Sequence, residues 1–127
     1  MAPPKHVLMN AFYDQLLSFL KELSEMYPDD ADFPLGLTGA RLMKTTSPKF
    51  LITQFYENSK AFADQILTKN EKFFLDHSFQ EFSGDESFDF NILAKLKGYV
   101  GTMSPASKEA VWSYVQNLFK LVQAFHS

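Results

Sequence analysis

The stretch HVLMNAFYDQLLSFLKELSEMY, residues 6–27, decides the fold class, because its apolar residues recur at alternating steps of three and four. This spacing places them on one side of an α-helix, while polar residues such as Asn10 and Asp14 fall on the other side. The stripe consists of Met9, Phe12, Leu16, Phe19, Leu23 and Met26. Pro28 ends the pattern, since its ring excludes continuation of the helix. We therefore predict a long amphipathic helix over 6–27, followed by a turn-rich acidic connection over 28–34.

A second long helix is predicted at the C-terminal end, over residues 105–126, from the same three-four spacing. Its seam consists of Val111, Val115, Leu118, Val122 and Phe125, and it is widened by Trp112, Tyr114, Phe119 and Leu121. A helix that is apolar almost all round lies at the centre of a bundle or offers a second face to a partner.

Three further helices are predicted between these two. Residues 35–46 form the weakest pattern, because two glycines lie inside it. A long helix over 48–68 is indicated by Ile52, Phe55, Phe62 and Ile66. A short helix over 90–100 follows from Phe90, Leu93, Leu96 and Val100. Serine–proline pairs at 47–48 and 104–105 are typical helix starts, with Ser as the N-cap and Pro at the first helical position.

Together these patterns predict an all-α fold. No segment shows the period-two alternation of a strand. We expect a single helical domain over 1–127, a bundle of about five helices (three long and two short) with no sheet. Residues 1–5 are expected to be a flexible N-terminus, and 77–88 a long connection.

Composition narrows the class of protein. The chain has 127 residues, 46% of them hydrophobic, which is typical of one globular domain. It contains no cysteine, which excludes a disulfide framework, and its net charge of −3 argues against a dedicated nucleic-acid binder. No secretory signal and no window of membrane-spanning length is present. We expect a soluble intracellular protein, in the cytoplasm or nucleus.

Motifs for metal or catalytic chemistry are absent from the sequence. The three histidines are far apart and form no helical ligand pair. The acidic stretch that begins at Asp85 has Phe and Leu where a calcium loop needs Gly and Glu. The Gly-x-x-Gly of GLTGAR, residues 36–41, is the pattern with which KH domains clamp nucleic acid, but those domains also need a sheet. We therefore predict no cofactor, no metal and no enzymatic activity.

Charge is unevenly distributed along the chain. Residues 33–56 and 90–108 contain no acid, whereas acids cluster in 22–32 and 71–89. A helix start inside each basic stretch offers N–H groups that favour anions. The candidate site for an anion or an acidic partner consists of Arg41, Lys44, Thr46, Ser47 and Lys49. The alternative is an ordinary charged surface with capped helices.

The segment NEKFFLDHSFQEFSGDESFDF, residues 70–90, contains six phenylalanines. Either these rings pack beneath a long connection, or some form an exposed aromatic patch that binds a partner. The candidate partner-binding residues are Phe79, Phe82, Trp112 and Tyr114. The leading hypothesis is a non-enzymatic protein that acts through protein–protein contacts or self-association, in an accessory or structural role. The alternative is a nucleic-acid-associated protein that uses basic stretches 41–49 and 95–108.

The order of these motifs resembles that of a group of small, uncharacterised helical proteins encoded by large DNA viruses of algae and protists. The matching stretches are FYDQLLSFLKELSEMYPDDADF (12–33), SPKFLITQFYE (47–57), EKFFL (71–75) and KEAVWSYVQNLFKL (108–121). The resemblance implies no catalytic residues. It implies an accessory, virion or host-interaction protein encoded by a virus.

Overall fold

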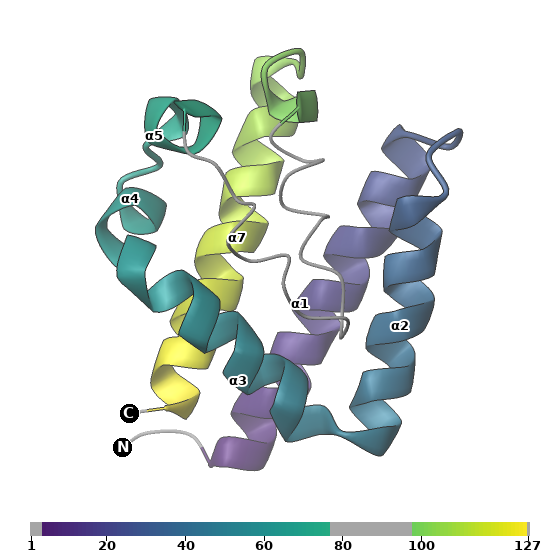
Figure 1. Ribbon diagram of the computed structural model, residues 1–127, viewed down its shortest axis with the longest axis vertical. Helices are drawn as coiled ribbons and strands as arrows, with labels where there is room; N and C mark the ends of the chain where they lie inside the picture. The colour runs from purple at the N-terminus through teal and green to yellow at the C-terminus, as the bar shows by residue number, and fades with distance from the viewer. Residues whose placement is uncertain (1–3, 77–97, 127) are drawn as a thin grey trace.

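The computed structural model describes residues 4–76 and 98–126, and these form a helical bundle (Figure 1). Within the two ranges there are six α-helices, four of which have seven or more residues, and no strands. The predicted all-α fold class is therefore confirmed. Most of the predicted helix over 90–100 lies outside the described residues. Its last three residues, 98–100, are described and are helical.

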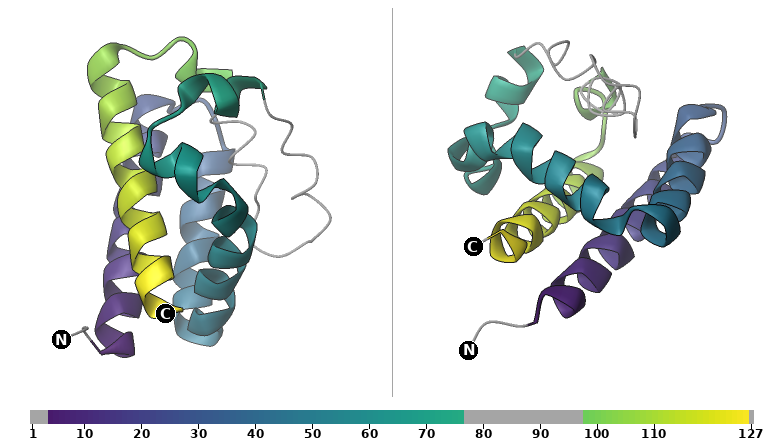
Figure 2. Two further views of the ribbon diagram at one scale, coloured as in Figure 1. Left: turned by 90° about the vertical axis from the view of Figure 1, so that its left-hand side faces the viewer. Right: turned by 60° about the horizontal axis from the view of Figure 1, so that its bottom comes forward.

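Two long helices, α1 (Lys5–Met26) and α7 (Pro105–Phe125), pack side by side and hold the bundle together (Figures 1 and 2). The α2 helix (Asp32–Thr46) packs along another side of α1 and forms an edge of the bundle. The α3 helix (Pro48–Ser59) crosses obliquely and contacts α1, α2 and α7. A 3₁₀ turn (Lys60–Phe62) then leads into the short helices α4 (Ala63–Leu67) and α5 (Glu71–Asp76).

The core consists chiefly of the two stripes that the sequence pattern indicates on α1 and α7. The buried side chains of α1 are Leu8, Phe12, Tyr13, Leu16, Phe19, Leu20 and Leu23. Those of α7 are Val111, Trp112, Leu118, Phe119, Val122 and Phe125. Because α7 packs against α1, α3 and α4, its almost all-round apolar surface belongs to a central helix of the bundle.

The α2 helix begins three residues earlier than its pattern predicts, so 32–34 are helical and not part of the turn. Pro34 is tolerated there because the N–H groups of the first helical turn have no partner within the helix. The Asp30 carboxylate accepts a hydrogen bond from the Asp32 N–H at 3.0 Å, which fixes the start. As a result Phe33 is fully buried.

The helix predicted over 48–68 is interrupted after Ser59. The Ser59 hydroxyl donates to the carbonyl oxygen of Phe55 at 2.6 Å, a bond to the preceding turn that often bends helices. The 3₁₀ turn follows directly, and α4 resumes in a new direction. Ile52 and Ile66 are nevertheless buried on the two sides of the break.

The phenol of Tyr13 ties α1 to the start of α3. Its hydroxyl donates to the Pro48 carbonyl oxygen at 2.8 Å, and burial raises the pKa of Tyr13 from 10.0 to about 12. In the unfolded chain the phenol has the lower pKa, 10.0. Stability from this group is therefore complete below pH 10.0 and is lost as the pH rises towards about 12.

We therefore expect the free energy of unfolding to fall more steeply above about pH 10 in the wild type than in Tyr13→Phe. The variant should be less stable by about 1 kcal/mol near neutral pH, because the Pro48 carbonyl loses its donor. Urea denaturation at a series of alkaline pH values measures both effects. Burial also raises the pKa of Tyr27 and Tyr114. The unfolding free energy of Tyr13→Phe should therefore still fall with pH in the alkaline range, but less steeply than that of the wild type. Equal slopes in the two proteins would contradict the role assigned to Tyr13.

Both serine–proline pairs start helices as predicted, but only one serine acts as a side-chain cap. The Ser104 hydroxyl accepts a hydrogen bond from the Ser107 N–H at 3.2 Å at the start of α7. Ser47 occupies the N-cap position of α3, yet its side chain makes no capping hydrogen bond.

We expect Ser104→Ala to lose about 1 kcal/mol of stability, the usual effect of removing an N-cap oxygen. Ser47→Ala is the matched control, and its stability should stay within about 0.5 kcal/mol of the wild type. Chemical denaturation of the two variants side by side measures the difference. A loss at Ser47 as large as that at Ser104 would contradict the two cap geometries.

Candidate functional site

The outward side of α2 carries the two most exposed large apolar side chains of the described ranges. Leu35 is 66% exposed and Leu42 is 60% exposed, although both are in a well-packed helix. They are seven residues apart, which is two helical turns, so they lie on the same side with exposed Thr38 between them. We call Leu35, Thr38 and Leu42 the α2 face. The opposite side of the helix buries Phe33, Gly36 and Ala40 against the bundle.

The five residues of the predicted anion site all lie at the junction of α2 and α3, and all are exposed. The last turns of α2 carry Arg41, Lys44 and Thr46, Ser47 is the junction, and Lys49 is in the first turn of α3. None of the three cations forms an ion pair with another residue of the described ranges. The junction is therefore a positively charged end of α2.

A small anion finds few hydrogen-bond donors at this junction. Pro48 has no N–H group, and the Phe50 N–H donates to the Ser47 carbonyl oxygen at 3.1 Å. The Thr46 hydroxyl donates to the Leu42 carbonyl oxygen at 2.8 Å. The arrangement suits an extended acidic surface better than an enclosed phosphate.

The Gly-x-x-Gly segment at 36–41 lies inside the α2 helix. A nucleic-acid clamp needs this motif in a loop with its backbone accessible, and a helix uses those groups internally. The second basic stretch, 95–108, is described only from residue 98. There Lys108 forms an ion pair with Glu71 at 3.2 Å, so its charge is partly neutralised.

The opposite end of α2 is acidic. Asp29, Asp30 and Asp32 line an open recess of about 630 Å³ together with Met26, Tyr27, Pro28, Ala31 and Tyr99. The Tyr99 hydroxyl donates to the Asp30 carboxylate at 2.6 Å, and the Tyr27 and Tyr99 rings stack with 3.8 Å between their centroids. These contacts fix the turn. The α2 helix thus runs from an acidic end, past the α2 face, to a basic end.

Two of the four predicted partner-binding residues are in described parts of the chain, and neither lies on an open surface. Trp112 is only 9% exposed. Tyr114 is half-buried, and its ring stacks on that of Phe19 with 5.0 Å between centroids. Phe79 and Phe82 lie outside the described residues.

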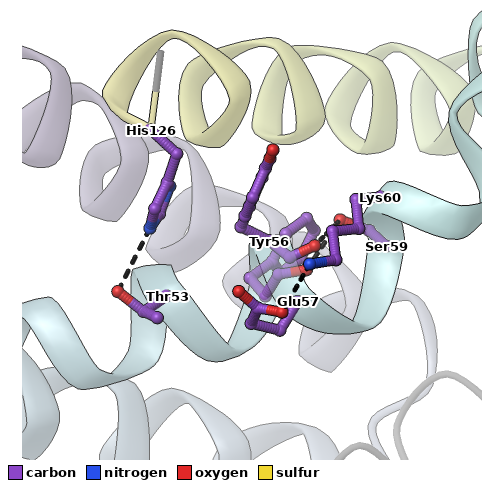
Figure 3. Close-up of polar contacts among 7 residues, drawn as sticks. Thr53, Tyr56, Glu57, Ser59, Lys60 and His126 are labelled. Atoms are coloured by element: carbon purple, nitrogen blue, oxygen red, sulfur yellow. Dashed lines mark hydrogen bonds and ion pairs between the residues drawn. The ribbon is translucent and has the colours of Figure 1, made fainter.

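The C-terminal end of α7 is fixed on α3 by His126, which the sequence did not single out as a contact residue (Figure 3). Its ring stacks on Tyr56 with 4.4 Å between centroids and an angle of 6° between planes. Its Nδ1 lies 2.8 Å from the Val122 carbonyl oxygen, which can only accept, so Nδ1 carries a proton. Its Nε2 lies 3.2 Å from the Thr53 hydroxyl oxygen. We interpret these contacts as a structural link that holds the end of α7 against α3.

No group of three or more His, Asp or Glu side chains in the described ranges is placed to hold a metal ion. None of the helices described is both long enough and apolar enough to cross a membrane.

A scan of the chain against protein-family models found no match, and searches of curated proteins and of solved structures likewise found none.

Proposed function

We propose that the chain is a helical interaction protein that binds another protein surface through the α2 face. The observation that carries this proposal is the exposure of Leu35 and Leu42 on one side of a regular helix. Fully burying a leucine side chain stabilises a complex by roughly 1.5–3 kcal/mol relative to leaving it in water, so a partner that covers both gains affinity. Apolar residues seven apart are the usual anchors of a helix that binds in a groove or against another helix.

Positive charge at one end of α2 supports this helix as a docking site. Arg41 lies one residue before Leu42, and Lys44 and Lys49 follow at the same end. Cations at the edge of an apolar contact increase the rate of encounter with an acidic partner and fix its orientation. We therefore expect binding to weaken as salt is added.

A photo-crosslinking amino acid at position 42 tests the proposal in cells that express the full chain. We expect a protein adduct from position 42 and none from position 120, an exposed lysine on α7 that serves as the control. The adduct should disappear when Leu35→Glu is added on the same face. Equal adducts from both positions, or none from position 42, would overturn the proposal.

A further inference from the structure

One end of the bundle collects positive charge from three helices. The start of α1, the junction of α2 and α3, and the end of α7 lie together there, at the lower end in Figure 1 and in the left view of Figure 2. The Lys5 ammonium lies 5.3 Å from the centre of the Phe125 ring, and the Tyr13 hydroxyl donates to the Pro48 carbonyl oxygen, so these segments are in contact. We use the name basic end for the four cations of this region and the two exposed apolar residues beside them, which are Lys5, Arg41, Lys44, Lys49, Val7 and Phe50.

The segments that form the basic end carry no negative side chain. Residues 4–13, 33–56 and 110–126 contain no Asp or Glu. Arg41, Lys44 and Lys49 are exposed, and none of them forms an ion pair with another described residue. The acidic turn at the start of α2 is about 22 Å away along that helix, whereas charges are screened over about 8 Å at physiological salt. The basic end therefore presents a positive surface although the whole chain has a net charge of −3.

The position of Lys44 places this surface at the end of the bundle. Lys44 follows Ala40 by one helical turn and lies on the same side of α2. Ala40 is fully buried against the bundle, whereas Lys44 is exposed. The core that covers this side of α2 therefore ends between these two residues. The Lys44 side chain lies beyond the core, on a different side of the helix from the α2 face.

Two exposed apolar side chains accompany these cations. Phe50 is 38% exposed and follows Lys49 directly, and Val7 is 46% exposed two residues after Lys5. Both are in the first turns of their helices. Peripheral proteins are held on membranes by cations that attract anionic headgroups and by apolar side chains that enter the boundary with the acyl chains. The basic end supplies both contributions side by side.

We propose that the basic end docks on the surface of a membrane that contains anionic phospholipids, a role that goes beyond the protein contact proposed for the α2 face. The surface is spread over separate helices and offers few donors to a single phosphate, since the Phe50 N–H and the Thr46 hydroxyl bond within the chain. A planar field of headgroups satisfies such a surface without a dedicated pocket. Aliphatic Val7 has no counterpart on a phosphodiester backbone, so a nucleic acid would use only part of the surface.

Electrostatic attraction sets the strength of this contact. Each Lys or Arg near an anionic membrane strengthens binding about fivefold, so four cations contribute several hundredfold. Two apolar side chains that enter only the boundary region add less than a lipid anchor does. The attachment is therefore reversible and weakens as salt is added.

Co-sedimentation of the purified full chain with vesicles tests the proposal. We expect binding to phosphatidylcholine vesicles that contain about 30% phosphatidylserine, and none to pure phosphatidylcholine. Lys44→Glu with Lys49→Glu should weaken binding at least about twentyfold. Lys21→Glu with Lys72→Glu is the matched control, because it changes the net charge equally at exposed lysines outside the basic end. Circular dichroism confirms that each variant is folded. An equal loss in the two double variants, or no preference for the anionic vesicles, would overturn the proposal.

A fluorescent label tests the orientation of the chain on the membrane. The chain has no cysteine, so one introduced cysteine places an environment-sensitive dye at a single position. The dye on Phe50→Cys should shift its emission to shorter wavelength with anionic vesicles, since this position leaves water. The dye on Leu67→Cys, an exposed leucine of α4, should not shift. Shifts of equal size at both positions would contradict docking by the basic end.

Two comparisons separate membrane docking from the other uses of these surfaces. Leu35→Glu should leave vesicle binding unchanged while it removes the protein adduct from position 42, so the lipid contact and the proposed function can fail independently. Loss of vesicle binding in Leu35→Glu would assign the lipid contact to the α2 face and overturn the basic end as its site. Fluorescence anisotropy with labelled RNA and DNA oligonucleotides at the same salt tests nucleic acid. A chain that binds these oligonucleotides but not the anionic vesicles would also overturn membrane docking.

Discussion

Replacement of Phe33 by alanine is expected to lower the free energy of unfolding by about 3–5 kcal/mol, the usual cost of deleting a buried ring. Phe33 is 0% exposed, and its ring lies 6.0 Å from the Tyr27 ring and 5.9 Å from the Tyr99 ring, centroid to centroid. The cavity would open beside the turn that connects α1 and α2. Small domains are stable by about 5–15 kcal/mol in total, so this loss is large. Urea denaturation followed by circular dichroism measures it.

Phe50→Ala is the matched control for this prediction. Phe50 is 38% exposed in the first turn of α3, so its removal exposes little new apolar surface. We expect a loss below about 1 kcal/mol. If Phe33→Ala and Phe50→Ala lowered the free energy of unfolding equally, the buried position assigned to Phe33 beside the acidic turn would be wrong.

The sequence predicted the long helices well because three-four spacing states directly which side of a helix is apolar. Phe12, Leu16, Phe19 and Leu23 of α1 are buried, as their stripe indicates. The same is true of Leu118 and Val122 on α7. The apolar side of such a helix can be read from the spacing of its residues, whichever element packs against it.

The start of α2 and the end of α3 could not be predicted from local pattern in the same way. The start is fixed by the Asp30 side chain, which in turn accepts a hydrogen bond from Tyr99, 69 positions later in the chain. The end of α3 depends on one hydroxyl of Ser59 turning back to the preceding carbonyl. Neither contact leaves a periodic signal in the residues around it.

The candidate site was predicted only in part. The basic run identified Arg41, Lys44 and Lys49, because charge can be read directly from the sequence. Leu35 and Leu42 were missed, since the glycines of 35–46 weakened the helical pattern and no side of it could be assigned as buried. Once Gly36 and Ala40 are known to face the bundle, the two leucines must face away from it.

Replacement of Trp112 by alanine is the second change with a large expected effect, again about 3–5 kcal/mol of unfolding free energy. The sequence suggested Trp112 as an anchor for a partner, and the structure places it on a central helix at 9% exposure. A buried position and a role as surface anchor predict different stabilities for Trp112→Ala. A buried tryptophan supports the fold, so its removal lowers stability. A surface anchor would leave stability within about 0.5 kcal/mol of the wild type and change only binding.

Trp112→Phe is the control that separates lost packing from lost binding. It keeps an aromatic ring in the site, so we expect a smaller loss than for alanine, below about 1.5 kcal/mol. Trp112 is also the single tryptophan of the chain, so the fluorescence of the wild type reports its surroundings directly. Its emission should shift to longer wavelength on unfolding, when water reaches the indole. An emission that is already water-like in the native protein, together with a stable Trp112→Ala, would return Trp112 to the surface and to the list of candidate partner contacts.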